Sequence, residues 1–314
     1  MMNSPRAEAS KPPTLAPTPP ERPCRNPVPV KTQRNPPASE RNGTQSIERA
    51  LRVLRELAAR GEFGWRLSDL ATRCDVDKGT VHRVLACLVR ERFVQQRAAD
   101  KHYFPGPMLY ELGLSLTGYA AFQQACERRL AKFAAETEAI AWLMLRSGNE
   151  YVCNVRKGDL ELRGLMVHVG TRRPLFTSVG GVAILQTLPH LEAENILADN
   201  VQQEILQRGD GRLDALRKMR DRSHRHGFGV NLGDVAPGVH AFAVPVCGAD
   251  GRGVAAVCLT GLPEQFGEPR IDAVRDALNE VAADVQADAH QFLGALMQVP
   301  GIGTLDPAAI DKFK

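Results

Sequence analysis

Apolar residues recur with a helical period in the first folded part of the chain. One stripe follows Ser46, a residue suited to cap a helix N-terminus, and it consists of Ile47, Ala50, Leu51, Leu54, Leu57 and Ala58. The glycines of "RGEFGW" interrupt this helix, and a shorter helix is predicted from Ser68. The tight turn "DVDKG" then leads into a third helix within "VDKGTVHRVLACLVRERFV", residues 76–94.

Two short extended segments follow the third helix. They are "FVQQR" and "KHYFP", and the polar turn "AAD" joins them. Three helices and a small hairpin in this order are the outline of a winged helix-turn-helix. Pro107 suits the first position of a further helix, so a linker helix is predicted over residues 107–119.

The pattern changes beyond this linker. A helix at about 120–138 precedes three segments with strand character, "IAWLMLRS", "EYVCNVRK" and "LRGLMVHV". Two helical segments follow, "VGGVAILQTL" and "LDALRKMRDRSHRHG", and then two strands that pair across the turn "ADGR". With the final helix "RIDAVRDALNEVAADVQADAHQFLGAL", this order predicts an α+β domain built around an antiparallel sheet.

The ends of the chain differ from these folded parts. Eleven of the 21 prolines lie in residues 1–45, where large apolar side chains are scarce. Such a segment cannot bury enough apolar surface to offset its ordering entropy. The predicted organisation is a disordered tail (1–45), a winged helix-turn-helix domain (46–106), a linker helix (107–119), an α+β domain (120–292) and a C-terminal tail (293–314).

Composition narrows the class of protein. No run approaches the roughly 20 apolar residues of a membrane helix, and the N-terminus opens with prolines instead of a signal segment, so no membrane association and a cytoplasmic location are expected. The seven cysteines form no C-x-x-C pair and are expected to be reduced.

Basic side chains are concentrated in the first third of the chain. Residues 1–45 hold seven basic and three acidic side chains, and residues 46–110 hold twelve basic and eight acidic ones. Residues 111–314 hold twenty-one basic and twenty-five acidic side chains. The basic first third suggests a polyanionic partner.

The third helix separates two kinds of residue. Its apolar face consists of Val81, Val84, Leu85, Leu88 and Val89. Its opposite face carries Thr80, Arg83, Ala86, Cys87 and Arg90, with Lys78 and His82 at the flanks. Long polar groups at the N-terminal end and small ones further along suit insertion into a DNA major groove. An ordinary surface helix is the alternative for this segment alone, but the helix, turn and hairpin around it favour DNA binding.

One helix-turn-helix reads only a few base pairs, so two copies are expected to act on half-sites ~34 Å apart. The linker offers an apolar stripe for this purpose, Met108, Leu109, Leu112 and Leu116. The stripe by itself is equally compatible with packing inside its own chain.

The stretch "TSVGGVAIL" is the strongest candidate for a ligand site in the second domain. Thr177 or Ser178 can cap the helix, and Gly180 and Gly181 would let a small anion approach free backbone N–H groups. The alternative is that these glycines only let helix and sheet pack closely.

An enzyme is the less favoured interpretation. Ser178 lacks a nucleophile elbow, and the pair His224 and His226 has no further ligands at usable spacing, so neither a hydrolase-like enzyme with a fused DNA-binding domain nor a metal site is well supported. No cofactor is predicted. A DNA-binding scaffold that takes no ligand also stays open, and it differs from a sensor because its DNA affinity does not respond to a ligand.

Two long stretches resemble a known family. "SIERALRVLRELAARGEFGWRLSDLATRCDVDKGTVHRVLACLVRERFV" with "YFPGPMLYELG" resembles the DNA-binding domain of IclR-type bacterial transcription regulators. "GTRRPLFTSVGGVAILQTL" with "GFGVNLGDVAPGVHAFAVPVCGADGRGVAAVCLTG" resembles their ligand-sensing domain, and the resemblance covers about residues 46–290. It implies a GAF/profilin-like antiparallel sheet domain. It also implies a transcription regulator that binds double-stranded operator DNA, responds to a small-molecule effector, and forms a homodimer or homotetramer.

The resemblance also assigns residues by position. For DNA binding these are Lys78, Thr80, His82 and Arg83 in the third helix and Arg97 and Lys101 in the wing. For effector binding they are Val179, Gly180, Asn231, Asp234, Ala241, Cys258 and Thr260. Gly79 departs from the serine that is common at its position, and Val182 replaces a frequent lysine. The expected effector is an organic acid or an aromatic metabolite. Because Ala241 and Cys258 are less polar than in some relatives, an aromatic or aliphatic acid is favoured over a very small polar one.

Overall fold

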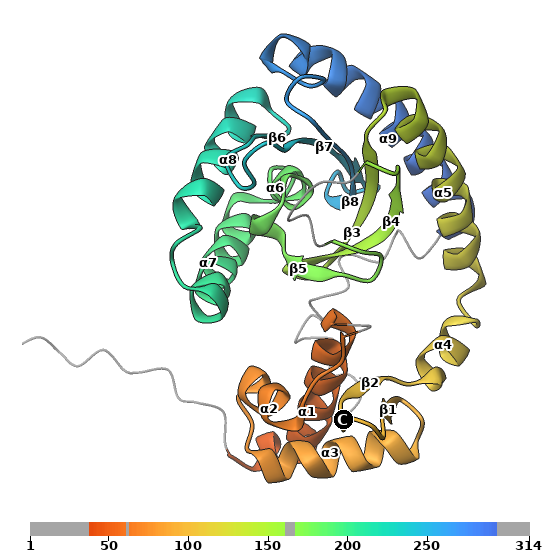
Figure 1. Ribbon diagram of the computed structural model, residues 1–314, viewed down its shortest axis with the longest axis vertical. Helices are drawn as coiled ribbons and strands as arrows, with labels where there is room; N and C mark the ends of the chain where they lie inside the picture. Colours follow the sequence, from red (N-terminus) through yellow and green to blue (C-terminus); the bar gives the residue numbers. More distant parts are fainter. Residues whose placement is uncertain (1–37, 61–62, 161–166, 294–314) are drawn as a thin grey trace, which may run out of the picture. The chain divides into compact units, whose positions relative to one another are not determined.

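The computed structural model describes residues 38–60, 63–160 and 167–293 (Figure 1). Its first part contains the helices α1 (Ala38–Arg60), α2 (Leu67–Cys74) and α3 (Lys78–Arg90), followed by the strands β1 (Val94–Gln96) and β2 (Tyr103–Pro105). The two strands pair antiparallel, with Gln95 opposite Phe104. The predicted winged helix-turn-helix is confirmed.

A small apolar core holds the three helices together. Val81 and Leu85 of α3 are fully buried beside Val53 of α1 and Leu70 of α2. Asp75 ends α2 in the left-handed conformation, with φ of 50°, which turns the chain sharply towards α3. The apolar face predicted for α3 is therefore correct except at Val89, which is 37% exposed near the end of the helix.

The structure corrects the predicted start of α1. The helix begins at Ala38, so Ser46 lies inside it and does not cap it. Its buried side centres on Val53 and Leu57, whereas Ile47 and Leu51 are 59% and 54% exposed. The apolar stripe extends beyond the part of α1 that α2 and α3 cover, and the last residues of the predicted tail, from Ala38 on, are helical. The rest of that tail lies outside the described residues.

The linker helix is shorter than predicted. α4 (Pro107–Gly113) has Pro107 in its first turn, as expected, but it ends at Gly113, and α5 (Thr117–Thr137) begins after three intervening residues. No residue of α4 is buried. Four apolar side chains of this segment are each more than half exposed: Tyr110, Leu112, Leu114 and Leu116. Few side chains of the described part of the chain therefore pack against the linker.

The C-terminal domain is built on one antiparallel sheet of six strands in the order β5-β4-β3-β8-β7-β6. The strands are β3 (Ile140–Ser147), β4 (Glu150–Lys157), β5 (Arg172–Pro174), β6 (Gly229–Leu232), β7 (His240–Cys247) and β8 (Gly253–Gly261). β3, β4, β7 and β8 match the predicted segments. The strand predicted in "LRGLMVHV" falls largely on residues outside the described part, and residues 167–169 are not a strand.

Helices cover both faces of this sheet (Figure 1). α5 and α9 (Ile271–Leu293) pack on one face against side chains such as Leu143 and Val257. α6 (Val179–Leu185), α7 (His190–Arg208) and α8 (Leu213–His226) form the second core with Trp142 and Cys258. The predicted α+β class is confirmed, whereas α7 and β6 were not predicted. The apolar residues of α7 are spread around the helix, and β6 has only four residues.

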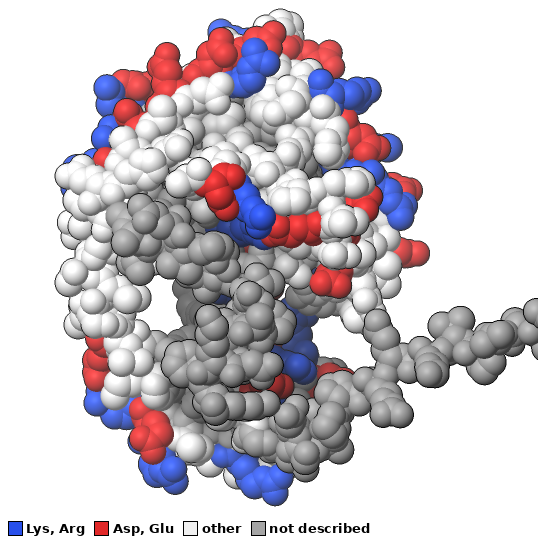
Figure 2. Space-filling view, turned by 180° about the vertical axis from the view of Figure 1, so that it is seen from behind, with Lys and Arg blue, Asp and Glu red and all other residues white. Residues whose placement is uncertain are grey.

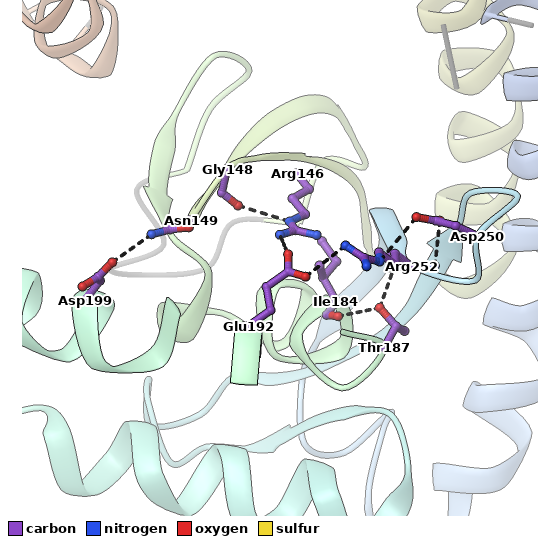
Figure 3. Close-up of polar contacts among 10 residues, drawn as sticks. Arg146, Gly148, Asn149, Ile184, Thr187, Glu192, Asp199, Asp250 and Arg252 are labelled. Atoms are coloured by element: carbon purple, nitrogen blue, oxygen red, sulfur yellow. Dashed lines mark hydrogen bonds and ion pairs between the residues drawn. The ribbon is translucent and has the colours of Figure 1, made fainter. Parts of the chain in front are cut away.

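A polar network holds α6 and α7 at one end of the sheet (Figure 3). Glu192 of α7 accepts hydrogen bonds from Arg146 at 2.6 Å and from Arg252 at 3.1 Å. Beyond the end of α6, the Thr187 hydroxyl accepts a hydrogen bond from the Gly253 N–H at 2.7 Å. The end of α6 is thereby fixed at the start of β8.

Within the described residues no helix is both long and apolar enough to cross a membrane. The cysteines in that part of the chain are free thiols. Cys74, Cys126, Cys153 and Cys258 are buried among apolar side chains, and desolvation raises the pKa of each of these thiols.

Candidate functional site

The N-terminal end of α3 presents polar side chains to solvent. Asp77 caps the helix, and its Oδ1 accepts a hydrogen bond from the Thr80 N–H at 2.8 Å. The hydrogen bonds from Thr80 hold the pKa of the Asp77 carboxyl below its usual range. Figure 2 shows Lys and Arg side chains at the lower end of the view, the end at which Figure 1 places α3.

The structure brings the four residues predicted on α3 to its first two turns. Lys78, His82 and Arg83 are exposed and Thr80 is half-buried. Arg83 Nη2 donates to Thr80 Oγ1 at 3.0 Å, which orients the guanidinium along the exposed face. A guanidinium carries five N–H donors, so Arg83 keeps donors beyond the one that it gives to Thr80.

The two residues predicted in the wing, Arg97 and Lys101, have different surroundings. Lys101 is exposed at the turn of the hairpin, where it adopts a φ of 60°. Arg97 instead forms a two-pronged ion pair with Asp100, at 2.9 Å and 2.6 Å, and its guanidinium lies 4.6 Å from the centre of the Phe104 ring. Lys101 is thus exposed at the turn of the wing, whereas the Arg97 guanidinium is already engaged by a carboxylate.

Sheet register brings four of the predicted effector residues together. Asn231 of β6 is opposite Ala241 of β7, and Ala241 is opposite Thr260 of β8. Cys258 lies two residues along β8 and therefore points to the same face. Side chains from three strands form one continuous patch at this end of the sheet, which we call the sheet-end patch: Asn231, Ala241, Cys258 and Thr260.

The start of α6 packs directly on this sheet. A methyl group placed on Gly180 would lie 2.7 Å from Cys258 Sγ and 2.8 Å from Met144 Sδ, and one on Gly181 would collide with the Leu175 carbonyl. Ser178 caps the helix, since its Oγ accepts from the Gly181 N–H at 3.0 Å. Close packing of helix and sheet, the alternative reading of the two glycines, accounts for both of them. Val179 is buried in the same contact.

Two of the polar candidates, Asp234 and the patch residue Asn231, stabilise the loop between β6 and β7. Asp234 accepts from Arg222 Nε and Nη2, both at 3.2 Å. Asn231 Oδ1 accepts from the Val235 N–H at 3.2 Å, and its amide donates to the Val239 carbonyl at 3.4 Å. These residues shape the loop beside the sheet-end patch, and their polar atoms already have protein partners.

Sequence reasoning missed two residues beside the patch. The Trp142 indole N–H donates to Thr260 Oγ1 at 3.0 Å, and the Arg156 guanidinium lies 5.3 Å from the centre of the Trp142 ring. Both residues lie in strands that were predicted, but only strand register shows that Arg156 is directly opposite Trp142.

Ser178 and the pair His224 and His226, which the sequence offered as possible enzyme residues, have structural explanations. Ser178 is the cap of α6, and its hydroxyl lies 3.8 Å from Met144 Sδ. His224 is exposed near the end of α8, and His226 packs edge-on against Phe228. No group of three His, Cys, Asp or Glu side chains in the described ranges is placed to hold a metal ion.

Comparison with known families matches both domains. The model of the IclR helix-turn-helix domain matches residues 46–98, and that of the bacterial transcriptional regulator IclR C-terminal domain matches residues 121–287. The glycerol operon regulatory protein of Streptomyces griseus is 30% identical over 252 residues, which are 77% of this chain and 97% of that protein. The HTH-type transcriptional repressor AllR of Escherichia coli K12 is 25% identical over 264 residues, covering 79% and 93%.

Solved structures share the fold. An IclR family transcriptional regulator from Brucella abortus superimposes with a TM-score of 0.62 at 19% identity, over 81% of this chain and 96% of that chain. An IclR homologue from Microbacterium hydrocarbonoxydans, crystallised with 4-hydroxybenzoate, gives a TM-score of 0.57 at 20% identity, over 78% and 99%.

The cap on α3 generates a test. Replacing Asp77 by alanine leaves the Thr80 N–H without its acceptor, so the amides of the first turn of α3 should exchange with solvent faster, by roughly fivefold. Asp77→Asn keeps an equally good cap and should exchange at close to the wild-type rate. Hydrogen exchange followed by mass spectrometry or NMR measures the difference. Equal exchange in Asp77→Ala and wild type would show that the cap does not order this turn.

Proposed function

The chain belongs to the IclR family of bacterial transcriptional regulators, and we propose that α3 and the wing read its operator while the sheet-end patch binds an organic acid. It is a DNA-binding regulator of transcription, and the relatives named above are regulators and a repressor. The observation that carries the DNA half of the proposal is the exposed polar end of α3, backed by the fully buried Val81 and Leu85. Operator DNA lies in the bacterial cytoplasm, and the protein acts there.

The DNA contacts divide by chemistry. Arg83 is oriented by Thr80 and supplies paired donors for a base edge, with His82 beside it. Lys78 and Lys101 are exposed ammonium groups that neutralise phosphates. Arg97 joins the phosphate contacts once a phosphate replaces Asp100, because both anions accept the same two N–H groups.

The effector half of the proposal is supported by the composition of the sheet-end patch. Ala241 is its half-buried apolar member and Thr260 provides a hydroxyl. Val179 and Gly180 of α6 close one side, where Gly180 covers the buried Cys258. Asn231 and Asp234 hold the loop that borders it. An organic acid with an apolar body fits this mixture. The Microbacterium homologue, which has the same fold, was crystallised with an aromatic acid.

A homodimer is the smallest assembly that the linker supports. Leu112, Leu114 and Leu116 are 52%, 59% and 52% exposed, and Ile47 and Leu51 of α1 are exposed as well. Covering such side chains with a second copy removes apolar surface from water and places two copies of α3 on one operator. Further pairing of dimers would give the tetramer.

The division of DNA contacts can be measured on an operator selected in vitro from random duplexes. Arg83→Ala should lose about 1 to 3 kcal/mol on the selected sequence and discriminate less between bases, while Lys101→Ala should weaken all sequences alike and flatten the salt dependence. Fluorescence anisotropy at several salt concentrations gives both quantities. If the two variants behave identically on selected and random DNA, these roles are wrong.

A sensor and a scaffold differ in their response to ligand. Adding the correct organic acid should change operator affinity at least fivefold, because an effector acts through its different affinities for two states of the protein. Anisotropy with a panel of aromatic and aliphatic acids measures this. An operator affinity that no acid alters would favour the ligand-independent scaffold.

The linker prediction concerns assembly. Leu112→Glu together with Leu116→Glu should lower the sedimenting mass and weaken operator binding at least tenfold at fixed protein concentration, since charges oppose burial of the seam. Leu206→Glu is the matched control, because Leu206 is 79% exposed on α7, outside the linker. Analytical ultracentrifugation reads the outcome. An unchanged sedimentation coefficient in the double variant would place the dimer contact elsewhere.

A further inference from the structure

We propose that Arg156 is the cation that binds the carboxylate of the effector, an inference that rests on the proposed sensing function of the sheet-end patch. Arg156 lies on β4 directly opposite Trp142 of β3. Trp142 is in turn opposite Cys258 of β8, so Arg156, Trp142 and Cys258 form a row across three strands. The side chain of Arg156 therefore belongs to the same face of the sheet as the patch.

The position of the guanidinium follows from its contacts. Its central carbon lies 5.3 Å from the centre of the Trp142 ring, so the side chain extends over Trp142 and towards β8. Its Nη1 donates only a long hydrogen bond, at 3.5 Å, to the Gly158 carbonyl. On the other side of Trp142, the indole N–H donates to Thr260 Oγ1 at 3.0 Å. The indole thus connects a half-exposed cation to the hydroxyl of the patch.

Charge balance distinguishes Arg156 from its neighbours. Other arginines around the second core are paired with carboxylates: Arg146 and Arg252 with Glu192, Arg172 with Glu150, Arg212 with Glu204, and Arg222 with Asp234. Within the part of the chain that the structure describes, no carboxylate lies within ion-pair distance of Arg156. Asp159, the acidic residue that follows β4 in the sequence, is exposed to solvent. A ligand carboxylate would supply the missing counter-charge.

The other groups at the patch suit the same ligand. Because Thr260 Oγ1 accepts from Trp142, the hydroxyl proton of Thr260 is available to a second acceptor such as a carboxylate oxygen. Burial raises the pKa of the Cys258 thiol, so it stays neutral and does not repel an anion. Ala241, which is half-buried on the same face, then faces the non-polar part of the ligand, while Cys258 lies buried beneath Gly180. The structure assigns to this site a small carboxylic acid with an apolar body, held at its charged end by Arg156 and Thr260.

The experiment compares acids with their uncharged amides on the full-length protein. Benzoate with benzamide, and butyrate with butyramide, are titrated at pH 7 by isothermal titration calorimetry into wild type, Arg156→Gln and Arg128→Gln. Arg128 is the matched control because it is exposed on α5, and its loss removes the same charge from the same domain. At least one acid should bind at least tenfold more tightly than its amide to wild type and to Arg128→Gln. In Arg156→Gln that preference should fall at least tenfold, with amide affinity unchanged.

Three results would overturn the assignment. They are equal affinity for acid and amide in wild type, an acid preference that survives in Arg156→Gln, and no binding of either acid. Circular dichroism and operator affinity without ligand are measured on the same three proteins. These two measurements distinguish a loss of folding from a loss of ligand binding. Arg156→Lys, which retains the charge, should keep part of the acid preference. Failure of wild type to bind any selected operator would instead contradict the regulator function, whatever the titrations show.

Discussion

The pairing of β3 with β8 at the centre of the six-stranded sheet is the constraint on which the C-terminal domain depends. Successive residues of these strands belong to different cores: Leu143 and Val257 pack under α5 and α9, while Trp142 and Cys258 pack under α6. Because side chains alternate strictly along a strand, a slip by one residue would exchange every one of them between the two faces. The position of the sheet-end patch is therefore a consequence of the register that buries both cores.

α6 packs closely on the sheet at both of its ends. Its start rests through Gly180 on Cys258 and Met144, and Thr187 beyond its end accepts a hydrogen bond from Gly253. The loop after β6, by contrast, depends on a few polar contacts, among them the ion pair between Asp234 and Arg222. A ligand that alters DNA affinity must bind two states of the protein differently. The loop side of the patch is held by polar side-chain contacts instead of close backbone packing, so we expect a ligand-dependent change there.

The DNA-binding domain uses the same separation of faces on a smaller scale. Val81 and Leu85 are buried completely, and this orientation leaves Lys78, His82 and Arg83 in solvent. The two wing residues show that exposure alone does not define a contact, because Arg97 is engaged by Asp100 while Lys101 is not. The apolar residues that remain exposed on α1 and the linker belong to a surface that a second copy covers in the proposed dimer.

Local sequence pattern determined much of this fold, including the positions of β3, β4, β7 and β8, a helix cap at Thr177 or Ser178 and the polar face of α3, because each depends on residues a few positions apart. It did not predict α7, because the apolar residues of α7 are spread around the helix. It also misplaced the start of α1, because Ser46 resembles a helix cap although the helix already begins upstream at Ala38. The role of Gly180 was undecided until the sheet placed Cys258 and Met144 against it. Arg156 could not be linked to Trp142 and Thr260 from the sequence, because they come together only through the register of β4, β3 and β8. That register depends on how both faces of the sheet are buried at once, a property of the whole domain and not of any single segment.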